Sequence, residues 1–209
     1  MKLLIFGATG GTGRELVRQA LEQGHLVTAF VRDPSKYGIG DNSLRIVEGD
    51  IIDYESVNNA VKGQNIVISA LGVNLMGKNT ILSSGTKNIL KAMEEYNVRR
   101  FVCVTSLGVG NSKGQLGWKY NFIIKPFILR NIFADKERQE KFIKDSLLDW
   151  IIVRPAQLTN GPLTGKYHTW TGKPPEEMEN KISRADVAHF ILTQLVDDTY
   201  LRDTPALSY

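Results

Sequence analysis

The chain has 209 residues, enough for one domain with a sizeable buried core. Hydrophobic residues make up 42% and charged residues 23%, as in ordinary soluble proteins, and no apolar run approaches the ~20 residues of a membrane-spanning helix. The single cysteine, Cys103, excludes an internal disulfide, so a reducing compartment fits best. We therefore expect a soluble cytoplasmic protein without a secretory leader or a membrane partner.

The formal net charge is +4, and it comes from one segment. Residues 113–145 hold eight lysines and arginines and four acids, a surplus equal to the charge of the whole chain. The segment is either a solvated helix face of mixed charge or a basic rim beside an anionic cofactor or substrate. Since the rest of the chain is balanced, we expect no nucleic-acid partner.

Short β-branched apolar runs alternate with helical segments, a pattern typical of βαβ units and a parallel sheet. A first strand over 3–6 precedes a helix over 12–23, which ends at Gly24. Further strands are predicted over 26–31, 44–47, 66–70, 101–105 and 150–153, and further helices over 54–62, 80–96 and 134–144, with a last helix capped by Ser183 and Asp186. We expect an α/β, Rossmann-like doubly wound parallel sheet with helices on both faces, as a single domain over residues 1–209.

The loop after the first strand reads Gly7-Ala8-Thr9-Gly10-Gly11-Thr12-Gly13. Gly7 permits the tight turn, Gly10 lets the backbone approach a pyrophosphate, and Gly13 lets the helix pack against the sheet. Backbone N–H groups at the helix start then face the phosphates, and Thr9 and Thr12 add hydroxyl donors. The context of strand, loop and amphipathic helix makes this a dinucleotide site, with Gly11 part of the same loop.

The second strand is followed by Arg32, Asp33, Pro34 and Ser35. An arginine at this strand end suits the 2′-phosphate of NADP through a charge-assisted pair, and Ser35 can donate to the same phosphate. Asp33 leaves the alternative of a ribose contact open. The sequence favours NADPH over NADH.

Later strand ends offer further candidates for the same cofactor. Asp50 and Ile51 follow the third strand and are expected near the adenine, while Leu71 and Gly72 follow the fourth. Thr105 and Ser106 end the fifth, where a hydroxyl can reach the nicotinamide. These positions fall on one edge of the sheet. The three histidines and the cysteine show no metal-ligand spacing, so we expect no metal site.

Two segments fit the pattern less well. Residues 111–132 are rich in aromatic side chains, Trp118 and Phe127 among them, and residues 160–179 hold several glycines and prolines. Both follow strand ends, where open α/β sheets bind ligands. Each segment either packs as an ordinary loop or lines a substrate site, and whether 111–133 forms a lid stays open.

Taken together, the glycine loop, Val31-Arg32-Asp33, Gly49-Asp50, Leu71-Gly72 and Thr105-Ser106 resemble the atypical short-chain dehydrogenase/reductases. Residues 161–167, residues 182–190 and Tyr209 resemble one branch more closely, the biliverdin IXβ reductase or flavin reductase family. The resemblance implies an NADPH-dependent reductase of flavins and, in some members, linear tetrapyrroles. It implies a catalytic role for Ser106, a cofactor contact at Pro155, and a substrate contact at Gln157, where that branch has a histidine.

The Tyr-x-x-x-Lys pair of short-chain dehydrogenases is missing, because Tyr120 precedes Ile124 and Tyr167 precedes Thr171 at that spacing. Alcohol–ketone interconversion then lacks its acid. A flavin accepts hydride at its own nitrogen and takes a proton from water, so it asks less of the protein. We expect flavin as a substrate rather than a bound prosthetic group, in a monomer or weak homodimer. The alternatives are an NADPH-sensing binding protein without turnover and a carbonyl or quinone reductase.

Overall fold

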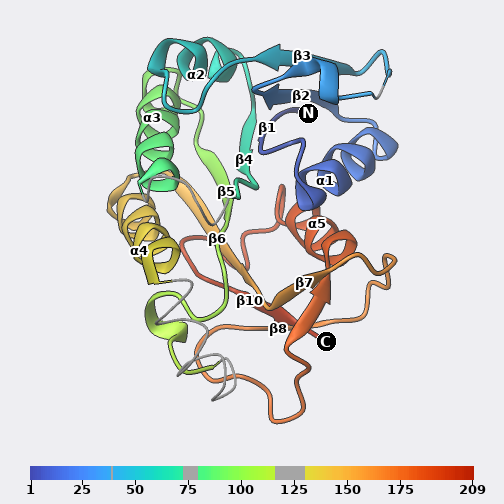
Figure 1. Cartoon of the computed structure of the whole chain (residues 1–209), viewed down its shortest axis with the longest axis vertical. Coiled ribbons are helices and arrows are strands. Elements are labelled where there is room, and N and C mark those ends of the chain that lie inside the picture. Colours follow the sequence, from blue (N-terminus) through green and yellow to red (C-terminus); the bar gives the residue numbers. More distant parts are fainter. Residues whose placement is uncertain (39, 73–79, 116–129) are drawn as a thin grey trace.

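A twisted, mostly parallel sheet forms the centre of the protein (Figure 1). The computed structural model describes residues 1–38, 40–72, 80–115 and 130–209. Within these residues the sheet has eight strands in the order β3-β2-β1-β4-β5-β6-β10-β8. The strands are β1 (Lys2–Phe6), β2 (Leu26–Val31), β3 (Leu44–Glu48), β4 (Ile66–Ser69), β5 (Arg100–Val104), β6 (Asp149–Pro155), β8 (His168–Trp170) and β10 (Ala206–Ser208).

The strand order reverses at β1, which pairs in parallel with both β2 and β4. Only the outermost described pair, β10 with β8, is antiparallel. A separate two-stranded parallel sheet joins β7 (Gln157–Thr159) to β9 (Lys181–Ser183). The doubly wound architecture predicted from the sequence is confirmed, and the reversal at β1 is the place where such sheets bind dinucleotides.

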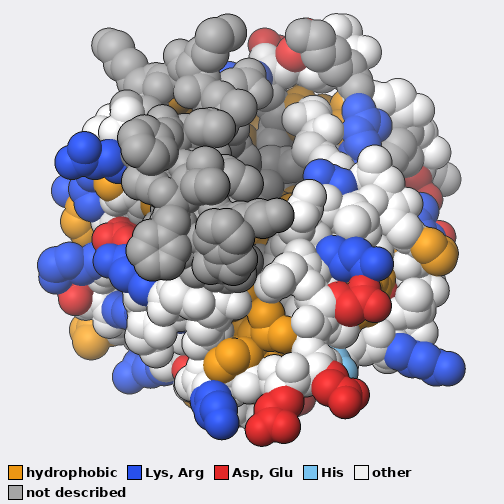
Figure 2. All heavy atoms as spheres, turned by 60° about the horizontal axis from the view of Figure 1, so that its bottom comes forward, with side chains coloured by type: hydrophobic (Ala, Val, Ile, Leu, Met, Phe, Trp, Pro, Cys, Tyr) orange, Lys and Arg blue, Asp and Glu red, His pale blue; other side chains and the backbone are white. Residues whose placement is uncertain are grey.

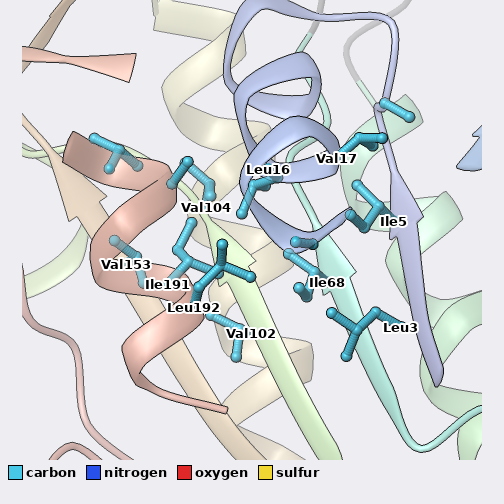
Figure 3. Packing of buried hydrophobic residues seen from close by; sticks show 14 of the residues in the cluster. Leu3, Ile5, Leu16, Val17, Ile68, Val102, Val104, Val153, Ile191 and Leu192 are labelled. Carbon is cyan, nitrogen blue, oxygen red and sulfur yellow. The ribbon is translucent and has the colours of Figure 1, made fainter. Parts of the chain in front are cut away.

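Helices cover both faces of the sheet, and the side-chain alternation along β1 shows why. Leu3 and Ile5 pack on one face with α1 and α5, whereas Leu4 and Phe6 pack on the other with α2 and α3. Figure 3 shows Leu16 and Val17 of α1 and Ile191 and Leu192 of α5 meeting the strand side chains. The helices are α1 (Gly11–Glu22), α2 (Tyr54–Val61), α3 (Ile81–Glu95), α4 (Arg130–Asp145) and α5 (Arg184–Thr193), with short 3-10 turns η1 (Pro34–Lys36) and η2 (Gly110–Ser112).

The six longer strands lie within two residues of their predicted limits, and α4 begins four residues earlier than predicted. The three-residue strands β7, β8, β9 and β10 were not predicted. No helix in the described part of the chain is long and apolar enough to span a membrane.

Candidate dinucleotide and acceptor site

The glycine loop connects β1 to α1 and lies against the end of β4. Gly7 has φ +78, and a Cβ there would stand 2.5 Å from the carbonyl oxygen of Ala70. A Cβ on Gly13 would stand 2.1 Å from the carbonyl oxygen of Gly7. Side chains at either position would therefore meet backbone that cannot move aside. The turn and close-packing functions assigned to these two glycines agree with the geometry.

Gly10 is the N-cap residue of α1 and has no side chain to cap the helix. Thr9, Gly10 and Gly11 are exposed, whereas Thr12 is buried, and the first turn of α1 carries no acidic residue. The first N–H groups of a helix have no partners within the helix and sit at the positive end of its dipole. The loop thus fits the pyrophosphate of a dinucleotide, because it offers an open, positively polarised cradle of main chain.

Two arginines flank the chain that follows β2. Arg32 is exposed directly after the strand. Arg14, one residue past the glycine loop, donates from Nε to the carbonyl oxygen of Thr9 at 3.1 Å and lies 5.5 Å from the ring centre of Tyr37. Burial raises the pKa of Tyr37 to about 12, so its ring stays a neutral platform for this contact. The contact of Arg14 with Tyr37 joins the glycine loop to the segment after β2.

The Asp33 side chain caps the η1 turn. Its carboxylate accepts hydrogen bonds from the N–H of Ser35 at 3.1 Å and from the Ser35 hydroxyl at 2.6 Å. Asp33, the alternative for the ribose, and Ser35, predicted for the 2′-phosphate, are therefore hydrogen-bonded to each other. Arg32 is exposed beside them, and its contact with a 2′-phosphate stays a prediction.

The segments after β3 and β4 reach the same edge. Asp50 is exposed and its Oδ1 accepts from the N–H of Ile52 at 3.0 Å, while Ile51 is buried against Gly85 of α3. Leu71 and Gly72 follow β4, beside the Ala70 carbonyl that contacts Gly7. Asp50 and Ile51, predicted near the adenine, and Leu71 and Gly72, predicted beside the middle of the cofactor, thus follow strands on either side of β1.

At the end of β5, Thr105 is buried and all of its polar groups are used inside the fold. Its hydroxyl donates to Glu140 at 2.8 Å, its N–H donates to the carbonyl of Val153, and its own carbonyl accepts from Nζ of Lys136 at 2.8 Å. Ser106 is partly exposed, and its hydroxyl donates to the Leu107 carbonyl at 3.1 Å. Of the two predicted hydroxyls, that of Ser106 is the one open to a ligand.

Lys136 was missed from the sequence. It lies on α4, partly buried, and loss of solvent lowers its pKa to about 8. The search for Tyr-x-x-x-Lys began from tyrosines, whereas here the lysine is present and Ile132 stands four residues before it. A search anchored on lysines in the helix that follows β5 would have found it.

A buried ion pair fixes the surroundings of Thr105. The Arg154 and Glu140 side chains are 2% and 3% exposed and form two hydrogen bonds, with Nε to Oε1 at 2.9 Å and Nη2 to Oε2 at 2.5 Å. Arg154 also donates to Asn111, and Glu140 accepts from Thr105. Because every charge in the pair has several partners, the ends of β5 and β6 and the middle of α4 are held in one arrangement.

The acceptor-side predictions have different outcomes. Pro155 ends β6 and is buried, and Gln157 opens β7 with an exposed side chain. Trp118 and Phe127, and with them most of the segment considered as a lid, lie outside the described residues. Of the residues predicted to contact the acceptor, Gln157 alone can be located, near the same edge as Ser106.

The charged segment 113–145 carries its own counter-ions. Salt bridges join Lys113 to Glu137 at 2.9 Å, Arg138 to Asp135 at 3.3 Å, Lys141 to Asp145 at 2.7 Å and Lys144 to Glu140 at 3.5 Å. On the face of the molecule in Figure 2, basic and acidic side chains are likewise interspersed. The described part of the segment thus favours the interpretation as a helix face of mixed charge.

A family model described as NAD(P)H-binding matches residues 7–198, from the glycine loop to the residues after α5. The chain belongs to this NAD(P)H-binding family. A chloroplastic protein of Arabidopsis thaliana is 32% identical over 213 residues, which cover 94% of this chain and 72% of that protein.

Two other relatives are longer. The photosystem II assembly factor Ycf39 of Synechocystis is 29% identical over 171 residues, which are 80% of this chain but 48% of that protein. Phenylcoumaran benzylic ether reductase TP7 of Nicotiana tabacum is 34% identical over 109 residues, 48% of this chain and 33% of that protein. The chain therefore spans half or less of the length of these two relatives.

Solved structures agree with the fold. A short-chain dehydrogenase/reductase of Veillonella parvula in complex with NADP superposes with a TM-score of 0.84 at 19% identity, covering 100% of this chain and 94% of that one. ChuY of Escherichia coli O157:H7, described as an anaerobillin reductase, gives a TM-score of 0.82 at 24% identity, covering 99% and 96%. At these identities the likeness shows the Rossmann architecture.

Proposed function

We propose that the protein is an NADPH-dependent reductase that passes hydride to a planar conjugated acceptor, a free flavin such as FMN or riboflavin, with biliverdin as a further substrate. One observation carries the proposal. Ser106 follows β5 and Lys136 of α4 donates to the neighbouring Thr105 carbonyl, but Ile132 stands where a catalytic tyrosine would precede that lysine. Because no tyrosine stands four residues before this lysine, the acid of alcohol–ketone interconversion is missing from its usual place. An acceptor that takes hydride into its own conjugated ring therefore fits this edge better than a ketone.

The choice of NADPH rests on the end of β2. Arg32 is exposed there, and the Asp33 carboxylate, which an NAD site would use for the ribose hydroxyls, already accepts two hydrogen bonds from Ser35. A guanidinium binds a phosphate through paired charge-assisted hydrogen bonds. The exposed Arg32 and the engaged Asp33 therefore favour a cofactor with a 2′-phosphate.

The protein's own residues act mainly by position. Bound NADPH supplies the hydride. Lys136 holds the Thr105 carbonyl and thereby the turn that carries Ser106. The partly exposed Ser106 hydroxyl donates to the Leu107 carbonyl, and its oxygen can accept a hydrogen bond from the acceptor or from the nicotinamide amide. Gln157 offers an amide that can donate to or accept from a flavin ring without titrating. Such orientation lowers the entropic part of the barrier.

The family resemblance of residues 161–167 and 182–190 to flavin and biliverdin IXβ reductases supports the acceptor class. Reduction is also the activity in the names of two proteins discussed above, the phenylcoumaran benzylic ether reductase and ChuY. Their names support a reductase and leave the acceptor of this chain to experiment.

The test is an acceptor screen under anaerobic conditions. NADPH oxidation is followed with FMN, riboflavin, biliverdin, a quinone and a simple ketone in parallel, with Ser106→Ala as the site variant. Flavin should stimulate NADPH oxidation, the ketone should not, and Ser106→Ala should lower the flavin rate. If neither a flavin nor biliverdin stimulates oxidation, the proposal fails, and a response to the quinone alone would make the protein a quinone reductase.

A second candidate is an NADPH-binding protein that regulates a partner without turnover. The name of Ycf39 as an assembly factor favours it, since this relative matches 80% of the chain. Tight NADPH binding together with no oxidation in the screen would select this function. We also propose a cytoplasmic monomer or weak homodimer, which fractionation and sedimentation of the native protein would test.

A further inference from the structure

Arg184, the first residue of α5, lies across the glycine loop of α1. A Cβ built on Gly11 would stand 2.5 Å from Cδ and 2.7 Å from Nε of Arg184. The stem of Arg184 thus occupies the space that any side chain at position 11 would need. The contact with Arg184 therefore explains why position 11 is a glycine, which the loop motif alone does not.

The guanidinium of Arg184 is held by a neutral group. Its Nη1 donates to the side-chain oxygen of Asn160 at 2.6 Å, which uses one of five N–H donors. No described carboxylate forms a salt bridge with Arg184. Six other arginines, by contrast, lie against carboxylates: Arg18, Arg99, Arg100, Arg138, Arg154 and Arg202.

The position next to α1 places this charge where an anion would bind. Arg184 lies against the first turn of α1, which has no acidic residue and which bears the positive end of the helix dipole. The guanidinium and the helix dipole therefore both favour a negative charge at this place. An anion bound at the loop would accept hydrogen bonds from the remaining guanidinium donors.

The base of Arg184 is fixed rather than free to swing. The Ser183 hydroxyl caps α5 by accepting from the N–H of Asp186 at 2.9 Å, and Gln19 of α1 donates to the Ala185 carbonyl at 2.9 Å. These bonds tie the start of α5 to α1. The backbone that carries Arg184 is thereby fixed, and the hydrogen bond to Asn160 holds the guanidinium itself beside the loop.

We propose that Arg184 binds the pyrophosphate of the dinucleotide, as a side-chain partner to the main-chain N–H groups of the glycine loop. The inference rests on NAD(P)H binding, which the family shows, and not on the identity of the acceptor. Arg32 and Arg184 then divide the recognition of one ligand. Arg32 selects the 2′-phosphate, and Arg184 contributes equally to NADP and NAD.

The test is binding, with no electron acceptor present. Dissociation constants are measured calorimetrically or by NMR titration for NADP⁺, NAD⁺ and 2′-AMP, which carries the 2′-phosphate but no pyrophosphate. Arg184→Ala should weaken both dinucleotides by about tenfold to a hundredfold and leave 2′-AMP unchanged. Arg32→Ala should show the opposite pattern, weakening NADP⁺ and 2′-AMP but hardly NAD⁺.

Two further variants separate charge from folding. Lys181→Ala removes a neighbouring exposed lysine, paired with Glu179, and should change none of the three constants. Arg184→Lys keeps the charge without the planar fork and should recover part of the dinucleotide affinity. An unchanged affinity of Arg184→Ala for NADP⁺ and NAD⁺, or an equal loss for 2′-AMP, would overturn the proposal. Because no acceptor is present, these results stand whether or not the protein reduces flavin.

Discussion

Residues 1–72 form their part of the site mainly with backbone, whereas residues 130–209 form theirs with buried side-chain charges. In the first region Gly7 and Gly13 work because they lack a side chain, and Arg32 projects into solvent. In the second, the fully buried Asp186 and the Glu140–Arg154 pair each collect partners from several segments. A contiguous motif thus encodes one half of the site, whereas the other half depends on contacts between residues far apart in sequence.

The Asp186 cluster, made of Asp186, Thr164, Gly165, Ser183 and Tyr209, illustrates the second kind. The carboxylate accepts from the N–H groups of Thr164 and Gly165 at 2.9 and 2.8 Å and from the hydroxyls of Thr164, Ser183 and Tyr209. Burial alone raises the pKa of Asp186, but hydrogen bonds from Tyr209, Gly165 and Thr164 outweigh it and leave the pKa below its ordinary value. The Asp186 carboxylate thus holds together the loop after β7, the start of α5 and Tyr209.

The largest expected effect comes from breaking the buried ion pair. Arg154→Met leaves Glu140 charged and without its main partner, and should lower the free energy of unfolding by about 3–5 kcal/mol. Urea denaturation measures the loss. The double variant Glu140→Gln/Arg154→Met removes both charges and should recover most of it. A loss below about 1 kcal/mol in the single variant would show that the pair does not hold the second region together.

The next effect concerns Asp186→Asn, which should cost about 2–3 kcal/mol because five donors lose a charged acceptor. The folded pKa lies below the unfolded value, so the ionised carboxylate stabilises the wild type above about pH 4 and this contribution disappears as the pH falls through the folded pKa. The stability difference between wild type and variant should shrink accordingly on acidification. Asp53→Asn, at the exposed cap of α2, is the matched control and should change stability little. A difference that is independent of pH would contradict the charge argument.

On the cofactor side, Arg32→Ala should weaken NADPH by about 1.5–3 kcal/mol, the range of a hydrogen bond to a charged group, and should hardly change NADH. Its free energy of unfolding should stay near that of the wild type, since the side chain is exposed. Arg45→Ala, an exposed arginine on the neighbouring β3, serves as the control for general charge. Equal losses for NADPH and NADH would refute a phosphate contact at Arg32.

The smallest effect is expected from Lys136, which joins the second region to the end of β5 through the Thr105 carbonyl. Because its pKa is about 8, it is protonated at neutral pH and loses the proton above that value. If the charge orders the Ser106 turn, turnover should decline as the pH rises through about 8, and Lys136→Met should be slower with no such decline. A decline that persists unchanged in Lys136→Met would assign it to another group.

The difference between the regions also explains what the sequence could predict. The six longer strands and the glycine loop follow from local patterns, namely β-branched runs, glycines at fixed spacing and an amphipathic helix. Strands β8 and β10 pair residues 168–170 with 206–208, and such short segments carry no periodicity of their own. Lys136 and Arg184 become site residues only when α4 and α5 are packed against β5 and α1, which local patterns do not report.

The central proposal is hydride transfer from NADPH to a flavin at the end of β5, and one anaerobic single-turnover experiment tests it most directly. The enzyme is loaded with NADPH deuterated at either face of C4 and mixed with FMN, and the loss of oxidised-flavin absorbance is followed. We expect FMN reduction that is slower when one face of the NADPH C4 carries deuterium and unchanged when the other face carries it. No FMN reduction, or equal rates with both labelled cofactors and with unlabelled NADPH, would contradict it.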